Sequence, residues 1–443
     1  TRGDARTDNE GSDTAPLTPA DNRNAQSFPF DDLLAAKRIT ASDVTFAVPR
    51  RNWTTGTVYD IYRHDYGERI TGTTTAQTSN SGVSTLFDAS FYVLTTARNV
   101  YKCLDNNGNS ASTVEPTTTP TTVIETGDGY KWKYMYTLSA SQQANFLSTD
   151  FMAVATDSTV SSAAVDGAID IVKIKSAGTG GANGTHTGIA IRGDGSNGQV
   201  SVTVAGGVVT AVTVTNAGTG YTFGTVSNAQ IVAAGATSLS GAELDVIIPP
   251  KGGHGKNAIE ELGGFFVMLN TSLEGTESGN SGDVTVANDF RKISLIRDPN
   301  ASGSAATATT LRGTKAINLT GVSGSYVVDE KITQATTGAV GKVVEWDSSN
   351  NILYYIQTRH TNDGIDSNGN LTAFSGTNVV SGAGGATGTP TTSTSTINNV
   401  SFTSGYSASE IDADSGDILY IENRAPITRA ADQTENIKLV IEF

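Results

Sequence analysis

A chain of 443 residues exceeds what one hydrophobic core usually organises, so we expect two or more domains. Its 29 basic and 44 acidic residues give a formal net charge of −15, which leaves no basic footprint for nucleic acid and no cationic helix for a membrane surface. The single cysteine, Cys103, excludes an intrachain disulfide, and no apolar run reaches the roughly 18 residues that a membrane span needs.

The composition predicts a mainly β fold. Only 16% of the residues are charged, and the 48 glycines are costly inside helices. Runs of Val, Ile, Thr and Tyr are broken by Gly and Asn, which is typical of many short strands joined by tight turns. We therefore expect strands throughout, with a few short helices.

The first 159 residues start with a polar, proline-containing arm over residues 1–30, which we expect to run extended across another surface. Local patterns then predict four elements in chain order: a helix at 31–39, strands from 43 to 62, a hairpin region at 90–109 that closes with the turn "DNNGN", and a helix at 139–147 capped by Ser139.

The stretch "GDGYKWKYMYTL" (127–138) carries an aromatic residue at every second position from 130 to 136. Alternate side chains of a strand share a face, so all four rings would line one side, either as a sugar platform or as part of a core. Leaving four large rings exposed would forfeit more than about 10 kcal/mol, so burial in a core or subunit interface is favoured. The opposite face, with Lys131, Lys133 and Thr137, suits solvent.

Two changes in composition mark inserted modules. "IDIVKIKSAGTG" at 169–180 recurs as "VTAVTVTNAGTG" at 209–220, a spacing of 40 residues, and the glycines of both copies indicate tight turns because no helix pattern follows them. A second Gly/Thr/Ser-rich region includes a hairpin formed by "VVEW" and "ILYYI" across "DSSNN". The predicted order is a core segment with its arm at 1–159, a Gly-rich β module at 160–248, a core segment at 249–300, a small β module with linker at 301–404, and core strands at 405–443.

The later core segments carry their own signals. Asn257 followed by Glu260 predicts a capping box at the start of a short helix. "FFVML" (265–269) and "DFRKISLIRDPN" (289–300) predict strands, and "DILYIEN" has apolar residues on both faces, as a central strand does. In the terminal "IKLVIEF", Ile437, Leu439, Ile441 and Phe443 alternate with polar or smaller residues and predict a strand with one buried face.

No pattern points to catalysis, a metal or a cofactor. The four histidines stand alone in sequence, and only His254, in "GGHG", is a weak candidate ligand or base. The acidic run "DADSGD" (412–417) is more typical of a solvated turn than of a calcium site or a glycosidase pair. No nucleophile elbow, P-loop or Cys/His signature occurs.

Five blocks, in this order, resemble the baseplate wedge protein of T-even-type contractile-tailed bacteriophages: "VPRRNW", "VYKCLD", "GDGYKWKYMY", "DFRKISLI" and "SGDILYIENRAPITRAADQTENIKLVIEF". The resemblance covers about half of the chain and leaves out the two inserted modules; one departure is Ala425, where the family pattern has a proline. The family-motif residues, for which the resemblance implies a structural role, are Pro49, Arg50, Trp53, Gly127, Asp128, Gly129, Tyr130, Trp132, Glu422, Asn423, Arg424, Pro426, Asp432, Gln433 and Thr434.

The resemblance implies a β-sandwich core, a homodimer, and a structural, non-enzymatic role without a cofactor in the tail baseplate of a virion assembled in the host cytoplasm. Other wedge proteins would be its partners, and the baseplate rearrangement that triggers sheath contraction would involve it. The polar arm at 1–30 would lie over a neighbouring wedge protein.

Two alternatives stay open. The chain could be a tail adhesin whose modules at 160–248 and 301–404 bind host surface glycan, or a glycan-degrading enzyme with a carboxylate pair in a groove. Glycan binding by the modules would favour the first, and turnover of host polysaccharide would favour the second.

Overall fold

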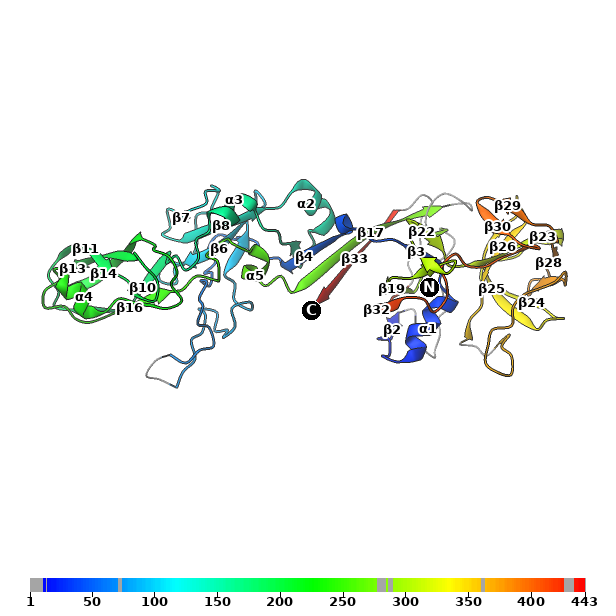
Figure 1. Cartoon of the computed structure of the whole chain (residues 1–443), viewed down its shortest axis with the longest axis horizontal. Coiled ribbons are helices and arrows are strands. Elements are labelled where there is room, and N and C mark those ends of the chain that lie inside the picture. The colour runs from blue at the N-terminus through cyan, green and yellow to red at the C-terminus, as the bar shows by residue number, and fades with distance from the viewer. Residues whose placement is uncertain are drawn as a thin grey trace. The chain divides into compact units, whose positions relative to one another are not determined.

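Strands dominate the computed structural model, which describes residues 11–12, 14–70, 74–276, 284–285, 290–359, 363–425 and 434–442 (Figure 1). The chain forms two compact units. The aromatic unit comprises Ala41–Asn270 with Lys438–Phe443, and the barrel unit comprises Thr1–Thr40 with Thr271–Ile437. The predicted mainly β fold is confirmed.

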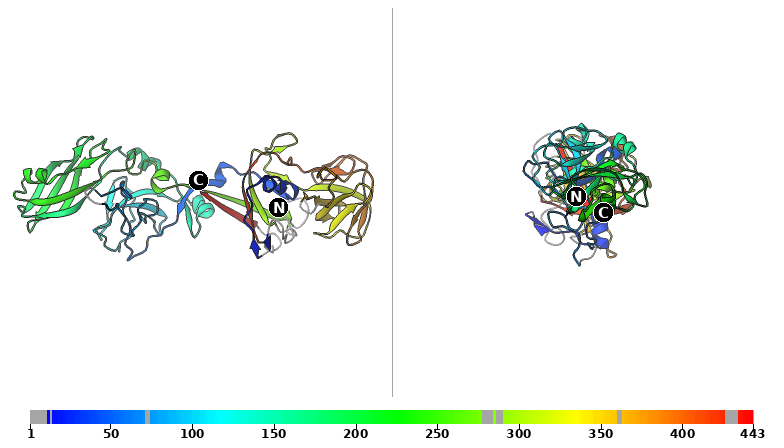
Figure 2. Two further views of the ribbon diagram at one scale, coloured as in Figure 1. Left: turned by 90° about the horizontal axis from the view of Figure 1, so that it is seen from below. Right: turned by 90° about the vertical axis from the view of Figure 1, so that its left-hand side faces the viewer.

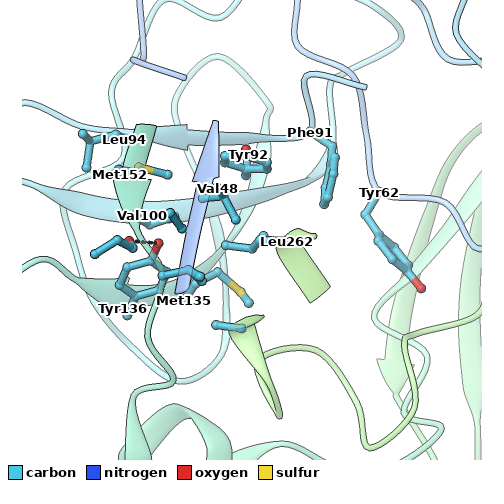
Figure 3. Packing of buried hydrophobic residues seen from close by; sticks show 14 of the residues in the cluster. Val48, Tyr62, Phe91, Tyr92, Leu94, Val100, Met135, Tyr136, Met152 and Leu262 are labelled. Atoms are coloured by element: carbon cyan, nitrogen blue, oxygen red, sulfur yellow. Dashed lines mark hydrogen bonds between the residues drawn. The ribbon is translucent and has the colours of Figure 1, made fainter. Parts of the chain in front are cut away.

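Two sheets of the aromatic unit enclose one hydrophobic cluster, as a β-sandwich does. Figure 3 shows Val48 and Met152 from one sheet meeting Leu94 and Met135 from the other. Within the aromatic unit, the first sheet contains β4 (Val44–Pro49), β9 (Phe151–Ala153) and the first residues of β17 (Phe266–Thr276). β18 (Val284–Thr285) and β33 (Thr434–Glu442) also pair with β17, but β18 and the start of β33 belong to the barrel unit. The second has the order β5 (Tyr92–Leu94), β6 (Asn99–Asp105), β8 (Lys131–Thr137) and β7 (Val123–Glu125).

Short helices connect these strands. Ser139 caps α2 (Ala140–Phe146) with a complete capping box, as predicted. The box predicted for Asn257 and Glu260 at α5 (Ala258–Leu262) is wrong: the Asn257 side chain does cap the helix, but Glu261 accepts the hydrogen bond from the Asn257 N–H. The remaining helices are α3 (Ser158–Ala163) and the 3-10 turn η1 (Ala41–Asp43).

The 160–248 segment of the aromatic unit has a hydrophobic cluster of its own. The repeated segments contain β10 and β14, and the glycines at their ends have positive φ. The expected tight turn is wrong at Gly178, which lies within the paired strand β10, and it stays a prediction at the other three glycines. The two copies pair differently, β10 with β16 and β14 with β13. The elements are β10 (Ile171–Thr179), β11 (Gly184–Ala190), β12 (Arg192–Gly193), β13 (Gln199–Ala205), β14 (Val208–Asn216), β15 (Gly224–Thr225), α4 (Asn228–Ala233) and β16 (Ser240–Ile247).

A closed antiparallel barrel forms the centre of the barrel unit, and its yellow-to-orange strands curve around one another in Figure 2. Pairing runs from β26 through β25, β24, β27 and β28 to β23, which pairs back with β26. The predicted "VVEW"–"ILYYI" hairpin is confirmed as β25 and β26. The strands are β23 (Lys315–Ser323), β24 (Lys331–Gln334), β25 (Ala339–Asp347), β26 (Ile352–Ile356), β27 (Val380–Gly382) and β28 (Thr387–Pro390), with β31 (Tyr406–Ser407) beside β23.

The other elements of the barrel unit are paired in twos. The strand pairs are β1 (Gly11–Ser12) with β2 (Ala15–Pro16), β3 (Ala35–Lys37) with β22 (Thr310–Arg312), β19 (Lys292–Arg297) with β32 (Asp417–Asn423), β20 (Asn300–Ala301) with β21 (Ser304–Ala305), and β29 (Ser395–Ile397) with β30 (Val400–Phe402). The unit also contains the helix α1 (Arg23–Asp31).

Three sequence expectations need correction in this unit. The helix predicted at 31–39 is wrong because residues 35–37 pair with β22, and tertiary pairing outweighs local helix propensity. The arm is not extended over its whole length, since α1 occupies 23–31 and its Asp31 carboxylate accepts two hydrogen bonds of 2.8 Å from Arg359. The central strand expected at 417–423 pairs only with β19 among the described strands, and Leu419 is 56% exposed.

The segments expected to form one core are divided between the units. Residues 41–159 and 249–270 lie in the aromatic unit, whereas residues 271–300 and most of 405–443 lie in the barrel unit. Strand periodicity finds the strands but does not say which of them pair. The boundaries drawn for the two modules stay a prediction.

Candidate functional site

The four alternating aromatic residues, Tyr130 just before β8 and three within it, are all buried, so the prediction of a core position is confirmed. Tyr130 stacks on Trp132 with ring centres 5.4 Å apart. The prediction that all four share one face is wrong, because a β-bulge at Met135 moves Tyr136 into the cluster between the sheets. Water therefore reaches too little of these rings for them to act as a sugar platform.

Of the three residues expected to face solvent, Thr137 is exposed and Lys131 is half-buried, but Lys133 is not at the surface. Lys133 is buried, and its ammonium group donates to the carbonyl of Thr121. It lies directly across from Lys102 of β6, which is also fully buried. The expectation that Lys133 faces solvent is wrong because a second layer, which includes α5, covers this side of the sheet.

A buried charge cluster surrounds the two lysines, consisting of Lys102, Lys133, Asp170, His254 and Glu261. The ammonium of Lys102 contacts the Glu261 carboxylate and lies 4.9 Å from the centre of the Tyr62 ring. Glu261 also accepts hydrogen bonds from the backbone N–H groups of Gly255, at 2.8 Å, and Asn257, at 3.1 Å. Gly255 has φ +91°, and a Cβ there would come within 2.5 Å of Val160, so this approach needs glycine.

Burial dominates the ionisation of the charge cluster. It lowers the pKa of both lysines against the pull of the nearby carboxylates, and it raises the pKa of Asp170 against the two ammonium groups. His254 stands edge-on to Tyr62 at 4.8 Å, and burial followed by repulsion from the lysines holds its pKa well below the usual value.

These surroundings argue against a metal cation at His254, because the ammonium groups of Lys102 and Lys133 would repel a positive ion. Among the described residues, no group of three or more His, Cys, Asp or Glu side chains could hold a metal ion. Sequence reasoning missed Lys102 and Glu261, since single charged residues 159 positions apart carry no spacing signal.

The "GDG" loop before β8 is held together by the Asp128 carboxylate. It accepts hydrogen bonds from the backbone N–H groups of Thr113, at 2.7 Å, and Val114, at 3.0 Å, and from the Thr126 hydroxyl. Burial alone would raise the pKa of Asp128, but these hydrogen bonds lower it to about 2. At Gly129, φ is +80° and a Cβ would lie 2.7 Å from the side chain of Asn107, so the turn at 127–129 needs glycine here.

Two blocks of the family motif meet at Ser112, which the sequence did not single out. The indole N–H of Trp53 donates to the Ser112 hydroxyl at 3.1 Å, and this hydroxyl lies 3.2 Å from the Asp128 carboxylate. The neighbouring Pro49 and Arg50 form other bonds: Pro49 accepts from the Tyr92 hydroxyl, and Arg50 donates to the carbonyl of Ser148, each at 2.7 Å.

The described C-terminal motif residues belong to the barrel unit. Glu422 and Asn423 end β32, and the Asn423 amide donates to the carbonyl of Leu17 at 2.9 Å. Arg424 lies 3.4 Å from the Glu435 carboxylate and over the ring of Phe290. Thr434 is exposed at the start of β33, whereas Pro426, Asp432 and Gln433 lie outside the described residues.

The acidic run at 412–417 is a surface turn, as predicted. Asp412 accepts from the backbone N–H groups of Ser302 and Gly303, and Asp417 pairs with Arg297. Its carboxylates are thus used in local contacts.

An exposed aromatic patch lies on the outer face of the β4–β17 pair, formed by Phe46, Phe87 and Phe265. Phe46 and Phe265 are each 48% exposed, and Phe87 meets Phe265 edge-on at 4.9 Å. Phe46 lies opposite Val267, so Phe265 is its diagonal neighbour on the same face. Grouped exposed rings of this kind are typical of a surface that another protein covers.

Polar contacts fix the 160–248 segment to the sandwich of the same unit. Arg63 pairs with Asp245 at 2.8 Å, and Lys173 pairs with Asp105 at 2.9 Å. The backbone N–H of Ile248 donates to Nδ1 of His64 at 3.2 Å. We call these contacts the root contacts.

Comparison with known proteins gives one match. A family model described as "Phage-Gp8: Bacteriophage T4, Gp8" matches residues 388–443, which include β29 to β33. No curated protein and no solved structure matches the chain. The match contains the last motif block and supports a structural role in a phage baseplate. None of the described helices has the length and apolar character to cross a membrane.

Proposed function

We propose that this chain is a component of the baseplate wedge of a contractile phage tail, where it holds neighbouring wedge proteins together. The observation that carries the proposal is the match of residues 388–443 to the gp8 family model. Three of the four upstream blocks, in the order of the resemblance, extend it to the aromatic unit, and the fourth, "DFRKISLI", includes residues of β19 in the barrel unit. We further propose that the chain takes part in the baseplate rearrangement that triggers sheath contraction and that it has no enzymatic activity.

The described side chains support a structural role. The aromatic rings of β8 are in the core, the carboxylates of the acidic run are used in local contacts, and the charge cluster is enclosed. Wedge joining requires rigid parts whose interfaces can repack between two arrangements. A sandwich and a closed barrel suit such parts.

The proposed homodimer has a candidate surface in the aromatic patch, because an isologous interface uses one self-complementary patch twice. We expect a concentration-dependent dimer in analytical ultracentrifugation, weakened by Phe46→Ser with Phe265→Ser. The matched control is Phe223→Ser, since Phe223 is 58% exposed but lies in the 160–248 segment. A wild-type chain that stays monomeric at all concentrations would refute the dimer.

Electron microscopy of intact virions with this chain tagged tests the assignment. Tag density at the baseplate, and wedges that fail to join when the chain is missing, are the expected results. Density elsewhere on the particle would overturn the proposal.

One observation favours the adhesin as a second candidate. Phe223 stands exposed at the β12–β15 end of the module, and the Asp194 carboxylate fixes its loop by accepting from the Thr222 N–H at 2.9 Å and from the Phe223 N–H at 3.3 Å. An exposed ring beside polar groups is able to stack on a sugar. Binding of the full chain to a glycan array, lost in Phe223→Ala, would favour this function.

A further inference from the structure

Lys102 and Glu261 form a side-chain pair from which water is excluded. Their side chains are 0% and 2% exposed, and the Lys102 ammonium contacts the carboxylate oxygen Oε2 of Glu261. Lys102 lies on β6 and Glu261 on α5, 159 positions apart. A covalent bond here would join two distant segments of the aromatic unit.

The carboxyl group of Glu261 has donors placed where a reacting carbonyl needs them. Its Oε1 oxygen accepts from the N–H groups of Gly255, at 2.8 Å, and Asn257, at 3.1 Å, and the Gly255 N–H is shared with Oε2 at 3.0 Å. When a nucleophile adds to a carboxyl carbon, negative charge collects on one oxygen, and two fixed N–H donors stabilise it. Oε2, on the side of Lys102, is the oxygen that can leave.

The surroundings also favour the reactive form of the amine. Burial lowers the pKa of Lys102, so a neutral amine is more accessible than at the surface. Burial raises the pKa of Asp170, which interacts electrostatically with both lysines. Because the two groups are held in contact, the reaction avoids the entropy cost of bringing them together.

We propose that Lys102 and Glu261 become joined by an intramolecular amide bond in the folded chain. The Nζ atom of Lys102 bonds to Cδ of Glu261, and the Cδ–Oε2 bond breaks. The ammonium gives up two protons, which leave with Oε2 as water, so no oxidant or activated co-reactant is needed. The product replaces a buried ion pair, which is costly to desolvate, with a neutral amide. It would also supply a covalent link in a chain whose single cysteine cannot form one internally, and it does not depend on the proposed function.

Intact-mass spectrometry of the purified, denatured full-length chain tests this directly. We expect a mass one water below that of the sequence, and a protease digest that contains a branched peptide linking Lys102 to Glu261. A mass equal to the sequence would overturn the proposal. So would a water loss that maps to another site, such as the Asp128–Gly129 bond.

Variants locate the chemistry. Lys102→Arg keeps the charge but has no nucleophilic amine, so the water loss should disappear. Lys173→Arg is the matched control, because Lys173 is also ion-paired in this unit, and its water loss should persist. If Lys102→Arg does not fold, the wild-type mass and peptide map still decide.

Discussion

Asp128 offers the sharpest test of how the "GDG" loop is held. In Asp128→Asn, the side chain keeps its shape but loses its charge and one acceptor. The fall in the pKa of Asp128 from 3.8 to about 2 corresponds to at most about 2.4 kcal/mol, at about 1.4 kcal/mol per pKa unit. The carboxylate is partly exposed, and solvent screening reduces this figure, so we expect a loss of about 1 kcal/mol in the free energy of unfolding at pH 7.

The direction in which this stability difference changes with pH follows from the lowered pKa of Asp128. A carboxylate with a depressed pKa stabilises the fold above its unfolded pKa, and this contribution disappears as pH falls through the folded pKa. The wild type should therefore lose its advantage over Asp128→Asn between pH 3.8 and about 2.

Tryptophan fluorescence during urea unfolding can follow this unit alone. Of the three tryptophans, Trp53 and Trp132 lie in the aromatic unit and Trp346 in the barrel unit, so a Trp346→Phe background isolates the signal. Asp150→Asn, at an exposed position of the same unit, is the matched control. Equal stabilities at pH 7, or a difference that does not shrink near pH 2, would refute the reasoning.

Three further predictions concern the same unit. Trp132→Ala should lower the free energy of unfolding by about 3–5 kcal/mol, because it empties a fully buried site; a circular-dichroism denaturation curve within error of the wild type would contradict this. His254 is buried with a depressed pKa, so wild-type stability should fall as pH drops below about 6.5, the unfolded value, and His254→Gln should flatten that slope in urea titrations. A double-mutant cycle with Arg63→Met and Asp245→Asn should give a coupling of about 0.5–1 kcal/mol in the same titrations, and additive effects would count against the root contacts.

Local patterns in the sequence predicted those elements whose signal is contained in a few neighbouring residues. The cap at Ser139, the β25–β26 hairpin and the alternation of β33 are of this kind. The same reasoning failed at residues 31–39, where pairing with a strand nearly three hundred positions later decides the conformation. Barrel closure between β23 and β26 is likewise a tertiary event that strand patterns do not encode.

The aromatic strand illustrates both outcomes. Its burial followed from the cost of exposing large rings, which depends only on residue type. The burial of its second face could not be predicted from the sequence, because the bulge at Met135 and the layer over Lys133 depend on partners elsewhere in the chain. The charge cluster was missed for the same reason: its members come from separate segments that only folding brings together.

The closed ring of six strands in the barrel unit affects how readily copies of this chain aggregate through their strand edges. Each of those strands has a hydrogen-bonded neighbour on both sides, so the ring itself offers no open ladder for another chain to extend. In the proposed baseplate role, copies that meet during assembly would otherwise risk joining edge to edge into aggregates. Closure thus lets a strand-rich chain accumulate while its specific contacts remain the ones that assembly uses.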